Sequence, residues 1–87
     1  MNIEDEFNEI VKQANNEKAF KDTLTTQNKL DFYKYYKQAM IGDCNIPKPL
    51  SIYLEASAKW KAWDEVRGMT KEDAMKHYVE LYDFLIS

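Results

Sequence analysis

The residues best suited to chemistry in this chain of 87 residues lie in the segment Tyr33-Lys34-Tyr35-Tyr36-Lys37. If the segment is helical, Tyr33, Tyr36 and Lys37 follow an i, i+3, i+4 spacing, which places two phenols and one ammonium on one face. An aromatic face can carry a planar ring, and phenol and ammonium groups donate hydrogen bonds to phosphate oxygens. The pattern suits a ligand with a flat base and phosphates beside it. An ordinary solvated helix face is the alternative.

Charge is distributed unevenly along the chain, although the net formal charge is only −3. Residues 1–25 carry three basic and six acidic side chains, residues 26–61 carry six basic and three acidic ones, and residues 62–87 again carry three and six. The middle of the chain is therefore positive and both flanks are negative. A small polyanion would be attracted to the middle, whereas a long nucleic acid would meet repulsive flanks, so we expect no nucleic-acid partner.

Metal binding and catalysis find little support in the sequence. His77 and Cys44 are the only soft ligands, they are far apart in sequence, and no carboxylates show ligand spacing. Cys44 has no marked base partner for nucleophilic chemistry. Gly42 and Gly68 are the only glycines, which excludes a glycine-rich phosphate loop. We therefore expect no enzymatic activity, no metal and no cofactor, with His77 at the surface or boundary of a helix.

The cysteine content, the length of the apolar runs and the amino-terminal residues indicate the cellular setting. With Cys44 as its single cysteine it can form no intramolecular disulfide, which suits a reducing compartment. Its apolar runs are shorter than the roughly 18 residues of a membrane span. The acidic amino terminus has no secretory apolar region. We expect a cytoplasmic monomer that forms one domain over residues 1–87 without stable membrane insertion.

The first half of the chain predicts two helices. The first runs from Ile3 to Ala14 and ends at the following asparagines, and a polar connector anchored by Phe20 and Leu24 covers residues 15–25. A second helix begins after Thr25 or Thr26, either of which could cap it, and ends at Gly42. Both prolines of the chain fall just beyond it, so residues 42–50 should be irregular.

The second half predicts two more helices. The third runs from Ile52 to Val66 with Ser51 as its cap, and its apolar face includes Ala56, Trp60 and Trp63. The spacing of the two tryptophans makes at least one of them core and leaves ligand contact open for the other. The fourth begins after Thr70, which precedes an acid by three residues in a capping-box-like arrangement. Its buried stripe comprises Ala74, Tyr78, Leu81 and Leu85. The fold class is all-α.

Three sequence blocks together resemble the acyl-CoA-binding protein family. They are Tyr-x-x-Tyr-Lys-Gln-Ala-x-x-Gly-Asp at 33–43, Lys-Trp-x-Ala-Trp at 59–63, and Ser/Thr-Lys-Glu-Asp-Ala-Met-x-x-Tyr at 70–78. The resemblance is strong over residues 26–82 and loose over the first helix. It implies a four-helix up-down-down-up bundle that binds medium- to long-chain acyl-CoA esters without catalysis, as an intracellular lipid carrier in fatty acid metabolism.

The resemblance also implies roles for individual residues. Tyr33, Lys37 and Lys59 would hold the ribose 3′-phosphate of the ligand. Tyr36 would stack against the adenine ring. Tyr78 would line the site beside the pantetheine and the acyl chain.

The acyl groove is less well specified by the sequence. We place Leu30 and Met40 on one helix face as lining residues, and Leu30 has the better support from the family. Whether Lys12 or Lys18 contacts the ligand is left open, and Glu55 is a carboxylate that cannot bind phosphate. The competing interpretation is a helical protein-interaction module without a small ligand, in which the aromatic face is a groove for a partner helix.

Overall fold

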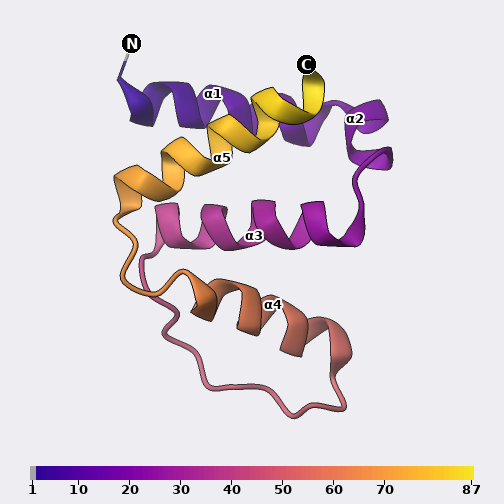
Figure 1. Ribbon diagram of the computed structural model, residues 1–87, viewed down its shortest axis with the longest axis vertical. Coiled ribbons are helices and arrows are strands. Elements are labelled where there is room, and N and C mark those ends of the chain that lie inside the picture. Colours follow the sequence, from indigo (N-terminus) through magenta and orange to yellow (C-terminus); the bar gives the residue numbers. More distant parts are fainter. Residues whose placement is uncertain (1) are drawn as a thin grey trace.

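The computed structural model describes residues 2–87, and this part of the chain contains helices and no strands. The helices are α1 (Ile3–Asn16), α2 (Lys18–Asp22), α3 (Thr26–Met40), α4 (Leu54–Glu65) and α5 (Lys71–Ile86). The four long helices run up, down, down and up, with α3 between α5 and α4 (Figure 1). α1 packs against α5 on the far side from α4. The predicted all-α bundle is confirmed.

The helix boundaries follow from local hydrogen bonds. At the start of α3, Thr25 Oγ1 accepts a bond from Asn28 N at 3.0 Å, and Asn28 Oδ1 accepts one from Thr25 N at 3.2 Å. This reciprocal pair is a capping box built on Asn. Thr70 Oγ1 accepts from Asp73 N at 3.0 Å and caps α5 as predicted. Gly42 follows α3 with φ of 101°, a left-handed conformation that favours glycine.

The connector after α1 contains a short helix, α2, which the sequence analysis did not predict. The two apolar anchors expected there, Phe20 and Leu24, do pack against the core. The Phe20 ring lies 6.0 Å from the Phe32 ring and 5.0 Å from the Tyr82 ring, measured between centroids. This aromatic packing fixes α2 despite its polar sequence, a tertiary effect that local propensity does not report.

The start of α4 also differs from the sequence prediction. Ser51 does not cap the helix, which begins two residues later than expected, at Leu54. Tyr53 N donates to the carbonyl oxygen of Leu50 at 3.0 Å, and the turn that this bond closes includes Ser51. Ala56, predicted on the apolar face of this helix, is exposed, so that part of the prediction was wrong.

The main core joins α1, α3 and α5 through aromatic packing. Tyr78 is central to it, because its ring meets Phe7 edge-on at 5.2 Å and Phe32 at 5.0 Å. The buried members are Phe7, Ala14, Phe32, Ala39, Ala74, Tyr78, Val79 and Tyr82. Leu81 and Leu85 are partly buried and pack against this cluster, which confirms the predicted stripe of α5.

The long connection between α3 and α4 follows from their direction. Because the two helices run the same way, the chain must return over the length of α3, about 22 Å for its 15 residues. Two tryptophans hold the returning segment against α4. Trp63 Nε1 donates to the Gly42 carbonyl at 2.8 Å, and Trp60 Nε1 donates to the Ile46 carbonyl at 2.9 Å. Trp63 is fully buried and Trp60 is partly buried. The prediction that at least one of the two is a core residue is confirmed.

A polar latch joins the end of α3 to the turn before α5. Gln38 is buried, and its Nε2 donates to Asp43 Oδ1 at 2.9 Å and to the Met69 carbonyl at 2.7 Å. Asp43 Oδ1 also accepts from Gly68 N at 2.8 Å. The Gly68 and Gln38 bonds, together with the nearby Arg67 guanidinium, lower the pKa of Asp43 below its ordinary value of 3.8.

None of the helices described over residues 2–87 is both long enough and apolar enough to span a bilayer.

Candidate functional site

A groove of about 540 Å³ lies between α3 and the first half of α4. Its lining is mainly apolar with three charged side chains, and comprises Thr26, Lys29, Leu30, Tyr33, Leu54, Glu55, Ala58 and Lys59. Three of the predicted site residues, Leu30, Tyr33 and Lys59, therefore share one cavity. Leu54 and Ala58 are lining residues that the sequence interpretation missed. Their i, i+4 spacing on α4 is the signal that could have found them.

Two lysine ammonium groups flank the ring of Tyr33. Lys59 Nζ is 5.5 Å from the ring centroid and Lys37 Nζ is 5.9 Å from it. Lys37 Nζ also lies 5.1 Å from the ring centre of Trp63, the most deeply buried tryptophan. Cations at these distances are attracted by the aromatic quadrupole, which orders the lysines without neutralising them. The predicted cluster of Tyr33, Lys37 and Lys59 is thus assembled from two helices.

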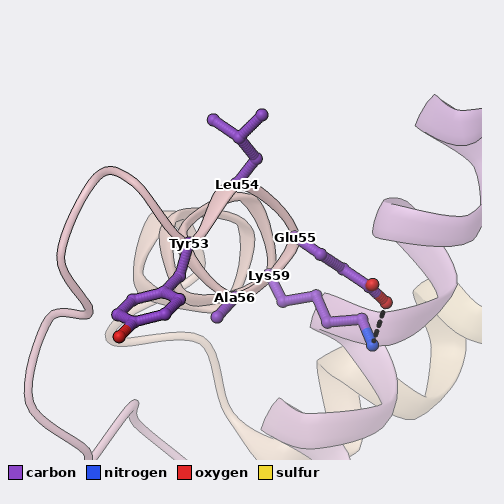
Figure 2. Close-up of a pocket in the computed structure, with 5 residues that line it drawn as sticks. All are labelled: Tyr53, Leu54, Glu55, Ala56 and Lys59. Atoms are coloured by element: carbon purple, nitrogen blue, oxygen red, sulfur yellow. Dashed lines mark ion pairs between the residues drawn. The ribbon is translucent and has the colours of Figure 1, made fainter.

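Lys59 has a carboxylate partner within the groove. Its Nζ lies 3.0 Å from Glu55 Oε1, one turn earlier on α4. Figure 2 shows both side chains extending from α4 towards the neighbouring helix, while Tyr53 lies on the opposite side of α4. Both side chains are well exposed, so this i, i+4 pair is weak and can be broken by a competing anion.

A second, smaller hollow of about 210 Å³ lies beside the groove, and is lined by Asn15, Lys29, Phe32, Tyr33, Tyr36 and Tyr78. Tyr33 and Lys29 line both cavities, so one face of α3 connects them. The Tyr36 side chain is 38% exposed, which leaves its ring accessible.

Tyr78 is a buried residue that lines the smaller hollow. Burial, assisted by the nearby Tyr36, raises the pKa of Tyr78 to about 12. Its phenol is therefore neutral at physiological pH and keeps its proton for donation. The hollow thus combines the partly exposed ring of Tyr36 with the hydroxyl donor of the buried residue Tyr78.

Met40 is separated from the other predicted site residues. It is half exposed and lies in a third hollow of about 460 Å³ near the starts of α1 and α5. Leu30 is ten residues earlier, about 15 Å along α3, so the structure does not bring these two side chains together. Lys12 is on the exposed side of α1, where it lines a separate hollow with Asp5, Asn8 and Glu9.

The chemistry available at the groove is binding chemistry. It offers ammonium and phenol donors for an anion, an accessible aromatic ring, and an adjoining apolar cavity. In the part of the chain that the structure describes, no group of three or more His, Cys, Asp or Glu side chains could hold a metal ion.

The family model described as "Acyl CoA binding protein" matches residues 4–82. The chain belongs to the acyl-CoA-binding protein family. Members of this family are non-catalytic binding proteins that take acyl-CoA as their ligand and use no cofactor.

Relatives and solved structures support membership. "Diazepam-binding inhibitor-like 5" of Rattus norvegicus is 50% identical over 62 residues, which are 71% of this chain and 71% of that protein. The crystal structure of Oryza sativa Acyl-CoA-Binding Protein 2 matches with a TM-score of 0.88 and 33% identity, over 97% of this chain and 88% of that one. The solution structure of the Babesia bovis acyl CoA binding protein matches with a TM-score of 0.82 and 45% identity, over 98% of this chain and 93% of that one. The family's bundle fold is confirmed.

Proposed function

We propose that this protein binds medium- to long-chain acyl-CoA esters non-covalently and carries or buffers them in the cytoplasm, as a monomer with one binding domain over residues 1–87. The observation that carries the proposal is the position of two ammonium groups near the ring of Tyr33, a residue that lines both the groove and the smaller hollow: Lys37 Nζ lies 5.9 Å and Lys59 Nζ 5.5 Å from the ring centroid. An acyl-CoA has the matching division into a polyanionic head and an apolar tail.

The head group is proposed to bind where the two cavities meet. Lys37 and Lys59 would donate charge-assisted hydrogen bonds to the 3′-phosphate, and the Tyr33 phenol would add a directional donor. Tyr36 would stack on the adenine ring, a contact worth about 1–3 kcal/mol by analogy with base–aromatic stacking. Because Glu55 already pairs with Lys59, the phosphate has to displace that carboxylate as it binds.

The acyl tail is proposed to occupy the groove between α3 and α4. Leu30, Leu54 and Ala58 supply apolar lining there, and Tyr78 borders the neighbouring hollow where the pantetheine would pass. Each methylene removed from water contributes about 0.8 kcal/mol, so the tail adds affinity and the head adds orientation. Met40 has no part in this groove as we define it, and its predicted role as a lining residue lacks support from its position.

The proposal is tested by measuring affinity across a series of acyl-CoA chain lengths. Affinity should rise with length until the groove is filled, and free CoA and free fatty acid should each bind poorly because each lacks one half of the ligand. Equal affinity for all chain lengths would contradict the assignment of the groove. If no acyl-CoA binds at all, the competing interpretation of a helical protein-interaction module is favoured.

A further inference from the structure

The segment that leads into α4 presents large apolar side chains to solvent. Leu50, Ile52, Tyr53 and Leu54 are 66%, 75%, 58% and 79% exposed, respectively. We call these four residues the apolar tip. Four exposed apolar side chains within five positions are unusual on a protein surface that faces water. They indicate a surface that contacts a membrane or another protein.

The apolar tip is held in place by hydrogen bonds, with few core contacts of its own. The Leu50 carbonyl accepts from Tyr53 N at 3.0 Å and from Ser57 Oγ at 3.1 Å. Upstream, the Ile46 carbonyl accepts from Trp60 Nε1. These bonds fix the backbone while the side chains stay in water. Figure 1 shows that the loop into α4 lies at one end of the long axis, and that the start of α1 and the end of α5 lie at the other.

Charge distinguishes this end of the molecule from the rest. Residues 44–61 carry three lysines, Lys48, Lys59 and Lys61, against the single carboxylate of Glu55. The first turn of α1, at the opposite end of the bundle, is acidic. A negatively charged surface would therefore attract the end that carries the apolar tip and repel the other.

We propose that the apolar tip docks peripherally on the surface of a phospholipid bilayer that contains anionic lipid. Every tip side chain is more than half exposed, so the surface projects and does not form the concave groove that a partner helix requires. Aliphatic side chains can enter the acyl boundary while the Tyr53 ring lies at the headgroups and Lys48 reaches lipid phosphate. Docking of this kind is reversible and needs no spanning helix.

The position of the tip gives the docking a consequence for the groove. Leu54 belongs both to the tip and to the groove lining, and Tyr53 and Leu54 line a further hollow together with Lys59. A docked protein therefore has one mouth of the groove directly at the lipid surface, where an apolar tail can pass between bilayer and protein with little exposure to water.

The test is co-sedimentation of the full chain with vesicles of phosphatidylcholine alone or phosphatidylcholine with phosphatidylserine. Leu50→Ser combined with Ile52→Ser removes two tip side chains that line none of the cavities described above. Phe84→Ser combined with Ile86→Ser is the matched control, because these α5 side chains are 75% and 53% exposed at the far end of the molecule. Circular dichroism and the midpoint of urea denaturation check that each variant is folded.

We expect wild type and the α5 control to bind the phosphatidylserine vesicles equally, and the tip variant to lose more than about tenfold in partition coefficient. Lys48→Glu should weaken binding to the anionic vesicles selectively. The proposal is overturned if wild type does not sediment with either vesicle, if the tip variant binds as wild type does, or if the α5 control loses binding to the same extent. These results do not depend on whether acyl-CoA is the ligand of the groove.

Discussion

Lys59 Nζ lies 3.0 Å from Glu55 Oε1, so the cation that we assign to the ligand's phosphate is already paired with a carboxylate of its own helix. The pair lies at the lining of the groove and would have to separate for the phosphate to bind. If Lys59 binds the phosphate as proposed, Glu55 acts against binding in two ways, because it competes for Lys59 and repels the incoming anion.

Replacing Glu55 by Gln should strengthen acyl-CoA binding. The expected gain is up to about fivefold, since an exposed ion pair of this kind contributes about 0.2–1 kcal/mol. Calorimetric titration with hexadecanoyl-CoA measures it. Glu72→Gln is the matched control, because Glu72 makes an i, i+4 ion pair with Lys76 on α5, away from the groove. An affinity unchanged by Glu55→Gln, or raised equally by Glu72→Gln, would show that the carboxylate does not compete.

Replacing Tyr36 by Leu should weaken binding by about tenfold or more, because the adenine loses its stacking partner. Tyr35→Leu is the control on the same helix. Tyr35 stacks on His77 with ring centroids 5.1 Å apart, on a different face, and should change stability without changing affinity. Competition between hexadecanoyl-CoA and a pantetheine thioester that lacks the nucleotide refines the test. Tyr36→Leu should not weaken the binding of the truncated ligand, because that ligand has no adenine to stack on Tyr36.

The raised pKa of Tyr78 predicts a loss of stability in alkali. The unfolded chain ionises this phenol near its ordinary value of 10.0, whereas the folded protein keeps it neutral up to about 12. The stabilising contribution is complete below pH 10 and is lost as the pH rises towards 12, because unfolding then releases a proton. Urea denaturation over this range should show a steeper decline in the free energy of unfolding for wild type than for Tyr78→Phe. Parallel curves would contradict the burial of this phenol.

The lowered pKa of Asp43 predicts the opposite behaviour in acid. Its carboxylate accepts hydrogen bonds from Gly68 N and Gln38 Nε2, so the folded state ionises at a lower pH than the unfolded chain. The stability that it contributes is present above its ordinary value of 3.8 and is lost as the pH falls through the folded value. The difference in unfolding free energy between wild type and Asp43→Asn should be constant near neutral pH and shrink in acid. If the difference in unfolding free energy did not change with pH, the stability that the latch contributes would not depend on the charge of Asp43.

The helices, and the shared helix face of Tyr33, Tyr36 and Lys37, could be predicted from the sequence because both depend on short-range spacing. The i, i+3, i+4 positions of Tyr33, Tyr36 and Lys37 fix them to one face of α3 whatever else the chain does. The hydroxyl caps at Thr25 and Thr70 are equally local. Membership of the family then rests on motifs within and between these segments.

The features that were missed depend on contacts between distant segments. The helix α2 exists because Phe20 packs on Phe32 and Tyr82, which no local pattern reports. The later start of α4 depends on the turn closed at Leu50. The sequence analysis places Met40 on the same helix face as Leu30, but ten residues of helix separate them, and they line different hollows.

The central claim is that Lys37 and its neighbours bind the phosphates of an acyl-CoA. Lys34→Ala is the matched control, since Lys34 is on the same helix but pairs with Asp31 at 3.3 Å. The decisive measurement is calorimetric titration of hexadecanoyl-CoA into wild type, Lys37→Ala and Lys34→Ala at two salt concentrations. We predict one-to-one binding to wild type, a loss of about tenfold or more for Lys37→Ala with a flatter salt dependence, and little change for Lys34→Ala. Equal affinities for wild type and Lys37→Ala would contradict the head-group site.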